Sequence, residues 1–194
     1  IEGISFPEAL RKLAARAGVT LDERPLSDTE KKQKAEREQQ REIMLLTANR
    51  YRDLLTRHPE GAAARTYLQQ REVTPETAAA YGLGYASAAR DSIVQLLKAK
   101  GLSLELAAQL GIIRQGERGW YDLLHNRLIF PIRDQHGQPI GFAGRVLDAG
   151  LPKYINSPES PLYHKSSILF GIDLALRDIR QNGTALIVEG YFDH

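Results

Sequence analysis

The last ten residues constrain the fold more than any other part of this 194-residue chain. Residues 185–188 are apolar and partly β-branched, a pattern that predicts a strand buried on both faces of a sheet. Glu189 and Gly190 follow this strand, and Asp193 comes shortly after them. Because ligands of open α/β sheets bind beyond the carboxyl ends of the strands, we expect Glu189 and Asp193 to serve metal or proton chemistry.

A glutamate at a strand end is more often solvent-exposed or ion-paired than functional. Gly190, which removes side-chain bulk, and the nearby Asp193 favour the functional interpretation of Glu189. A single carboxylate does not hold Mg²⁺, which prefers near-octahedral oxygen ligation, so further acids are expected from outside this chain. A parallel sheet also needs crossover connections, so residues 184–194 are expected to begin a larger sheet and to be loosely held or stabilised by a partner.

Composition excludes several classes of site. The chain contains no cysteine, which removes disulfides, thiolate catalysis and cysteine-based zinc sites. Its formal net charge of +2 is too small to indicate a nucleic-acid-binding protein by itself. The sequence contains no Walker-type phosphate loop and no apolar run long enough to predict a membrane span.

The first half of the chain has a helical pattern. A capping box at Ser5, apolar residues at helical spacing and Gly18 predict a helix over residues 5–18. Residues 27–42 carry balanced charge, which favours a solvated linker helix over a tail that binds nucleic acid or a partner protein. Residues 43–111 are predicted to form a set of short helices.

The second half is predicted to contain strands. Residues 127–133 and 139–144 flank a glycine-containing turn and predict a hairpin. Pro131 and Pro139 indicate edge strands or strand ends. A final helix is expected before the C-terminal strand, with Gly183 as its stop.

Cations recur among turn-forming residues between positions 127 and 165. Each one alone is best interpreted as an ordinary surface cation, but together they suggest a phosphate-binding face. Gly141 and Gly144 are expected to let the backbone approach a ligand. The cations of this group are Arg127, Arg133, Arg145, Lys153 and Lys165.

Six motifs follow one another in the second half of the chain: Arg127–Asp134, Gly141–Arg145, Pro152–Glu159, Tyr163–Lys165, Leu169–Gly171 and Val188–Asp193. Together they resemble the core of bacterial, DnaG-type DNA primases. Two upstream segments, Tyr67–Arg71 and Gly82–Tyr85, resemble the helical region of that family, and Phe6–Leu10 resembles the helix that ends its zinc-ribbon domain.

The resemblance implies an α+β fold: a helical N-terminal part, a small mixed or antiparallel sheet, and the first strand of a truncated α/β Toprim subdomain. It implies that residues 1–26 end a missing zinc-ribbon domain and that residues 27–42 are a charged linker. Residues 43–183 would be the N-terminal subdomain of the primase core, and residues 184–194 the start of Toprim. The family's Asp-x-Asp metal motif is not in this chain.

The resemblance also implies roles for individual residues. Glu189 would act as base and metal ligand, supported by Asp193, with Mg²⁺ or Mn²⁺ in the parent protein and zinc only in its missing domain. Seven further residues would hold nucleic-acid and nucleotide phosphates: Arg71, Arg127, Arg145, Lys153, Tyr154, Asn156 and Lys165. Mild departures from the family pattern include Phe192, where methionine is frequent.

The implied parent makes RNA primers on single-stranded DNA in the bacterial cytoplasm, at the replication fork. Its implied partners are template DNA, ribonucleoside triphosphates, the RNA–DNA hybrid and, through an absent C-terminal domain, the replicative helicase, with no membrane. This fragment alone is expected to be inactive. Two alternatives stay open: another Toprim enzyme, such as a nuclease or topoisomerase, or a non-enzymatic module that binds single strands.

Overall fold

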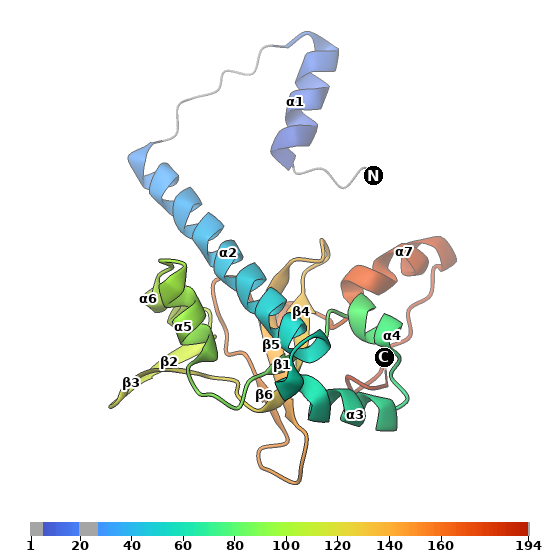
Figure 1. Cartoon of the computed structure of the whole chain (residues 1–194). Coiled ribbons are helices and arrows are strands. Elements are labelled where there is room, and N and C mark those ends of the chain that lie inside the picture. Colours follow the sequence, from blue (N-terminus) through green and yellow to red (C-terminus); the bar gives the residue numbers. More distant parts are fainter. Residues whose placement is uncertain (1–5, 20–26, 194) are drawn as a thin grey trace. The chain divides into compact units, whose positions relative to one another are not determined.

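The computed structural model describes residues 6–19 and 27–193. The chain forms two compact units, Ile1–Arg37 and Glu38–His194 (Figure 1). None of the helices in the described part combines the length and the apolar character that a membrane span requires.

The first unit contains α1 (Phe6–Ala17), which confirms the predicted N-terminal helix. Gly18 follows it with a φ of +65°, a conformation that glycine adopts readily at helix ends. The predicted cap residue Ser5 lies outside the described residues. Leu10 and Leu13, which belong to the predicted apolar face, are exposed, whereas the neighbouring Ala14 is buried.

Helix α2 (Asp28–Thr56) joins the predicted linker and the predicted helix after it into one continuous helix. Its charged N-terminal part is exposed, as a balanced run of acids and bases predicts. Burial begins within the predicted linker, at Gln40, and continues at Ile43 and Met44. The helix therefore packs earlier than its hydrophobic pattern indicates, and the predicted domain boundaries stay predictions.

The second unit is built on a four-stranded antiparallel sheet of order β1-β4-β5-β6. The central pair confirms the predicted hairpin, with Phe130 opposite Ala143. Its turn is fixed by Asp134, whose Oδ1 accepts hydrogen bonds from the backbone N–H groups of His136 and Gln138 at 2.9 and 3.0 Å. The strands are β1 (Gly84–Ala86), β4 (Arg127–Arg133), β5 (Pro139–Val146) and β6 (Tyr154–Asn156).

The prediction that Pro131 marks an edge strand or a strand end is wrong, because Pro131 lies inside β4, which is a central strand. The neighbouring strand β1 is short, and its Gly84 pairs with Ile129. Pro131 lies beyond the last β1 pairing, so no hydrogen bond from its backbone nitrogen is required on that side. Pro139 does begin its strand, as predicted, next to a bulge in the pairing at Ile132.

The two larger apolar clusters of the described chain include residues of the sheet, because successive side chains point to opposite faces. Ile129 and Phe142 join one cluster, together with residues of α5 (Ser92–Ala99) and α6 (Leu104–Gln109). Leu128 and Phe130 join the other. Helix α2 supplies residues to both clusters and crosses the sheet (Figure 1).

Short elements complete this unit and follow their local sequence signals. Thr74 and Ser103 accept hydrogen bonds from Thr77 N and Leu106 N, which confirms both predicted helix starts. Between α6 and β4 a separate hairpin lies beside α5 (Figure 1). The remaining elements are η1 (Pro59–Gly61), α3 (Ala62–Gln70), α4 (Pro75–Ala80), β2 (Ile113–Gly116), β3 (Gly119–Asp122) and η2 (Lys165–Ser167).

Helix α7 (Ile172–Asn182) ends at Gly183, as predicted, but no strand follows it. Residues 184–188 have no ladder partner in the described chain, and Leu186 and Ile187 are 90% and 74% exposed. The prediction of a buried strand here is therefore not met. A run of apolar, β-branched residues indicates that a segment can enter a sheet. The strand itself forms only where a neighbouring strand supplies backbone hydrogen bonds.

Candidate functional site

Arg145, near the end of β5, is enclosed by aromatic rings. Its guanidinium carbon lies 5.1 Å from the ring centre of Tyr154, 5.3 Å from that of Phe192 and 5.5 Å from that of Tyr67. Its Nη1 also donates a hydrogen bond to the Tyr154 hydroxyl. Only 8% of the residue is exposed, so the cation is stabilised by ring faces rather than by water.

Arg71 shares two of these rings. Its guanidinium carbon lies 5.4 Å from the centre of Tyr67 and 5.5 Å from that of Phe192, and the two rings meet edge to face at 6.1 Å. Arg71 caps the C-terminus of α3, and Figure 1 shows the C-terminal end of the chain beside that helix. We call Tyr67, Arg71, Arg145, Tyr154 and Phe192 the arginine–aromatic cluster.

The cluster borders a hollow of about 330 Å³ whose wall includes Arg71, Arg145 and Lys153. Within residues 27–193, none of these three cations forms an ion pair. One acid, Asp148, lines the same hollow. Cations without carboxylate partners on a concave wall attract anions, and guanidinium groups match the geometry of phosphate oxygens.

Two polar atoms of the cluster are buried without a hydrogen-bond partner in the described part of the chain. They are Arg145 Nε and the hydroxyl oxygen of Tyr67. Buried polar groups in folded proteins are nearly always hydrogen-bonded to protein, water or ligand. Within the described residues, the Arg145 Nε–H and the Tyr67 hydroxyl therefore have hydrogen-bonding capacity that no protein group satisfies.

Arg127 pairs with Val146, next to Arg145, but has a different environment. It is 6% exposed, and its Nη1 donates hydrogen bonds to the carbonyl oxygens of Gly144 at 3.3 Å and Pro152 at 2.9 Å. Burial lowers its pKa, and nearby Asp148 partly opposes that effect. The guanidinium thus holds the β5–β6 loop, and its predicted phosphate contact stays a prediction.

The predicted close approach at Gly144 is made by the protein's own side chains. A Cβ at this position would lie 2.9 Å from Leu124 Cδ2 and 3.0 Å from Arg127 Cδ. At Gly141 the added atom would meet the ring of Tyr163 at 3.2 Å. These glycines accommodate core packing rather than an open ligand surface.

The C-terminal acids lie on a turn that packs on the sheet. The backbone N–H of Asp193 donates to the carbonyl of Gly190 at 3.1 Å. A Cβ on Gly190 would lie 2.5 Å from Asp193 Oδ2, so the glycine gives room for this carboxylate. Glu189 itself is exposed.

Tyr191 anchors this turn. Its ring stacks on Phe130 at 4.9 Å between centres, and its hydroxyl donates to Asn156 Oδ1 at 3.3 Å. Burial raises the pKa of Tyr191 to about 12, so the phenol remains a donor at neutral pH. The turn is therefore better held than the sequence led us to expect for residues 184–194, although the segment before it is exposed.

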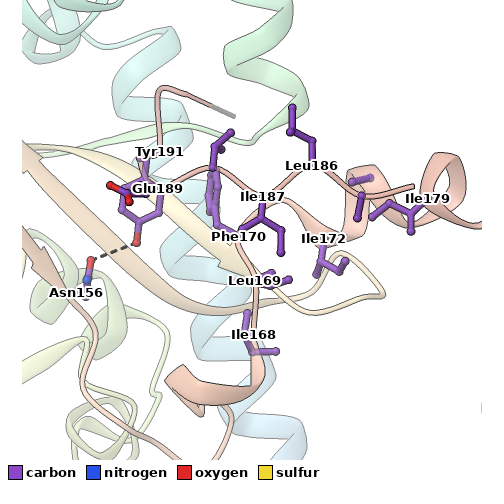
Figure 2. Close-up of a pocket in the computed structure, with 14 residues that line it drawn as sticks. Asn156, Ile168, Leu169, Phe170, Ile172, Ile179, Leu186, Ile187, Glu189 and Tyr191 are labelled. Atoms are coloured by element: carbon purple, nitrogen blue, oxygen red, sulfur yellow. Dashed lines mark hydrogen bonds between the residues drawn. The ribbon is translucent and has the colours of Figure 1, made fainter. Parts of the chain in front are cut away.

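Asn156 and Glu189 share a second pocket, of about 370 Å³. Figure 2 shows these two polar residues at one end and Ile172 and Ile179 of α7 at the other. The rest of the wall is mainly apolar, with Leu186 and Ile187 from the unpaired segment. The candidate catalytic acid Glu189 thus lines a pocket whose wall is otherwise mainly apolar.

Lys165 lies in η2 and lines neither pocket. Its backbone N–H donates to Glu159 Oε1 at 2.9 Å, and Glu159 also contacts His164 at 3.2 Å. The structure thus brings together Arg71, Arg145, Lys153 and Tyr154, places Asn156 with Glu189, and leaves Lys165 apart from both groups.

The described residues contain no group of three or more His, Asp or Glu side chains that could hold a metal ion. Glu189 and Asp193 supply carboxylate oxygens, the ligand type that Mg²⁺ and Mn²⁺ prefer. The residues present fit a partial metal site at most.

Tyr67 and Phe192 are the functional candidates that sequence reasoning missed. Neither is charged, and they are far apart in the sequence, so no local pattern links them. The available signals were the position of Phe192 beside Asp193 in the C-terminal motif and that of Tyr67 at the start of the Tyr67–Arg71 segment.

Comparison with known proteins identifies the family. Residues 50–176 match the family model of the DNA primase catalytic core, N-terminal domain. The chain belongs to this DNA primase family. The match covers Arg71, Arg145, Lys153 and Lys165 but ends before Glu189.

Relatives support the same family over almost the full chain. The DNA primase of Geobacillus stearothermophilus is 40% identical over 196 residues, which cover 100% of this chain and 33% of that protein. The DNA primase of Myxococcus xanthus is 40% identical, with 98% and 31% covered. The chain thus spans about a third of the length of these relatives.

Solved structures agree with the fold. The RNA polymerase domain of Mycobacterium tuberculosis primase DnaG, in complex with double-stranded DNA, matches with a TM-score of 0.76 and 40% identity, covering 80% of this chain and 50% of that one. A DnaG primase catalytic domain bound to single-stranded DNA matches with a TM-score of 0.71 and 34% identity, covering 82% and 51%. The Aquifex aeolicus primase structure, with zinc-binding and RNA polymerase domains, matches with a TM-score of 0.73 and 34% identity, covering 99% and 45%.

Proposed function

We propose that this chain is the part of a primase that holds the phosphates of the DNA template and of the incoming nucleotides. The observation that carries the proposal is that Arg71, Arg145 and Lys153 line one hollow and have no ion-pair partner within residues 27–193. Solved relatives bound to double-stranded and single-stranded DNA support a DNA partner.

We further propose that the whole protein joins ribonucleotides on single-stranded DNA. Glu189 would accept the proton of the attacking hydroxyl, whose oxygen bonds to the α-phosphorus as pyrophosphate leaves, and Asp193 would support Glu189. Mg²⁺ or Mn²⁺, held by these acids together with others, would supply charge stabilisation at the α-phosphate. In this arrangement Tyr191 positions Glu189 by fixing the turn to Phe130 and Asn156.

The remaining partners are part of the same proposal. They are ribonucleoside triphosphates, the RNA–DNA hybrid, zinc in a separate domain and the replicative helicase, acting at a cytoplasmic replication fork. A different Toprim enzyme is the less favoured alternative, because the family match rests on residues 50–176, upstream of the acidic motif. A non-enzymatic single-strand-binding module would share the cationic hollow but would not depend on Glu189.

Binding of an oligo(dT) to the 194-residue chain tests the proposal. If three cations contact phosphates, the slope of log K against log salt should be about −0.7 × 3, or roughly −2. Lys153→Ala should reduce the slope by about 0.7. Lys100→Ala, which removes an exposed cation after α5, is the matched control and should not change it.

In the full-length primase, Glu189→Gln should abolish primer synthesis and leave DNA affinity unchanged, because it removes a proton acceptor and not a phosphate contact. A near-zero salt slope that Lys153→Ala does not alter would contradict the phosphate-binding role. Primer synthesis by the Glu189→Gln protein would contradict the proposed base.

A further inference from the structure

We propose that Phe192 is a positioning residue: its ring fixes the guanidinium groups of Arg71 and Arg145 and so couples the acid-bearing turn to the cationic hollow. This inference rests on the proposed function, because it takes these two arginines to be phosphate ligands. It adds a role for an uncharged residue that does not itself contact phosphate.

The ring of Phe192 contacts two cations. Its centre is 5.5 Å from the guanidinium carbon of Arg71 and 5.3 Å from that of Arg145. Because both guanidinium carbons lie within 5.5 Å of one ring centre, the two like charges are near enough to repel each other. No carboxylate pairs with either arginine within residues 27–193. The negative face of an aromatic ring attracts a cation, and Phe192 shares this role with Tyr67.

The two arginines depend on Phe192 to different degrees. Arg145 has two further rings, Tyr67 and Tyr154, and donates a hydrogen bond to the Tyr154 hydroxyl. Arg71 has only one further ring contact among the described residues, with Tyr67, and its side chain is exposed. Loss of the Phe192 ring should therefore release Arg71 more than Arg145.

Phe192 also belongs to the segment that carries the candidate catalytic acid. Its ring packs edge to face on Phe130 of β4 at 5.3 Å, while the neighbouring Tyr191 stacks on the same ring. The turn from Glu189 to Asp193 is thus attached to the sheet on one side and to both arginines on the other. Because a coupling between two sites is reciprocal, an anion that reorients the arginines should also shift the turn.

A double-mutant cycle on the 194-residue chain tests the inference, with oligo(dT) binding as the readout. Phe192→Leu should weaken binding about fivefold and reduce the salt slope by about 0.7, as for the loss of one phosphate contact. Phe192→Tyr keeps a ring and should bind like the original chain. Tyr121→Leu, which takes a ring from Arg90 at 5.8 Å, is the matched control and should leave binding unchanged.

The decisive measurement combines Phe192→Leu with Arg71→Ala. If Phe192 acts through Arg71, Arg71→Ala should weaken binding about fivefold in the original chain and less than twofold in the Phe192→Leu background. Fully additive effects would overturn the inference, as would unchanged binding by Phe192→Leu in a chain where Arg71→Ala weakens it. If neither Arg71→Ala nor Lys153→Ala alters binding, the proposed function itself fails.

A second measurement does not depend on the folding of any variant. With fluorine-labelled phenylalanine in the original sequence, the Phe192 resonance should move when oligo(dT) is added, and the Phe142 resonance in the core should not. A Phe192 signal that stays unchanged at saturating oligo(dT) would overturn the coupling even if the cations bind DNA.

Discussion

Asp122 accepts a hydrogen bond from the backbone N–H of Ile93 at 2.9 Å, and so caps α5 from a distant strand end. Its second oxygen accepts from Val94 at 3.1 Å. The carboxylate is 2% exposed, and this burial raises its pKa to about 6. A helix start and a hairpin end are thus joined through one titratable group.

Stability should therefore fall as the pH rises from about 4 to about 6. The folded pKa of Asp122 lies above its unfolded value, so the folded state binds more protons in this window, and each pKa unit is worth about 1.4 kcal/mol. Urea unfolding at several pH values should show this decrease in the free energy of unfolding for the original chain. The decrease should be absent in Asp122→Asn. Asp28→Asn, at a fully exposed carboxylate, should retain the pH dependence. If the pH dependence persists in Asp122→Asn, other titratable groups cause it.

Arg127→Ala should reduce stability rather than binding. The substitution leaves the carbonyls of Gly144 and Pro152 without their donor, at a cost of about 1–3 kcal/mol. Lys100→Ala, at an exposed cation, should change the free energy of unfolding by less than about 0.5 kcal/mol. Urea midpoints of the two variants test this prediction. If Arg127→Ala has normal stability and weaker DNA binding, Arg127 contacts phosphates instead.

Gly84→Ala should destabilise the second unit. A Cβ at Gly84 would lie 2.5 Å from Tyr51 Cβ and 2.8 Å from the Tyr51 backbone carbon, so β1 or α2 must move, at a cost of about 1–3 kcal/mol. A Cβ at Gly101 would have no atom within 4 Å, so the strain in Gly101→Ala comes from the positive φ of 66° alone. This substitution should lower the free energy of unfolding by about 1 kcal/mol. Thermal unfolding of both variants tests this order, and equal losses would count against the close contact between β1 and α2.

The charged start of α2 should tolerate substitution. Replacing five exposed residues between positions 28 and 38 by alanine keeps the helix and should leave oligo(dT) affinity within about twofold, as for surface changes. The same exchange at Gln40, which is 3% exposed, should instead lower stability. A tenfold loss of affinity from the exposed set would reveal a contact surface in this segment.

Features set by neighbouring residues could be predicted from the sequence. Thr74 and Ser103 cap their helices through a hydroxyl that reaches a few residues ahead, and Gly183 ends α7 through its own backbone freedom. The β4–β5 hairpin was predictable because Asp134 fixes its turn locally. The family motifs identified Arg71, Arg145 and Lys153, which the structure then brings to one hollow.

Features set by distant partners could not be predicted. The tolerance for Pro131 in a central strand depends on where β1 stops, which the sequence around Pro131 does not contain. The burial of Arg127 depends on carbonyls of β5 and of the following loop. The role inferred for Phe192 depends on rings and cations from α3, β5 and the C-terminal turn meeting in space.

The rings around Arg71 and Arg145 affect how the hollow lined by these arginines responds to pH and salt. A carboxylate partner would lose its charge in acid and would compete with phosphate at neutral pH. The phenyl ring of Phe192 has no proton to lose and carries no charge that competes with phosphate, so its attraction for each cation does not change with pH while the fold persists. The part of the attraction for phosphates that depends on this ring should thus be insensitive to acidification over the range in which phosphodiesters stay ionised, although it remains sensitive to salt.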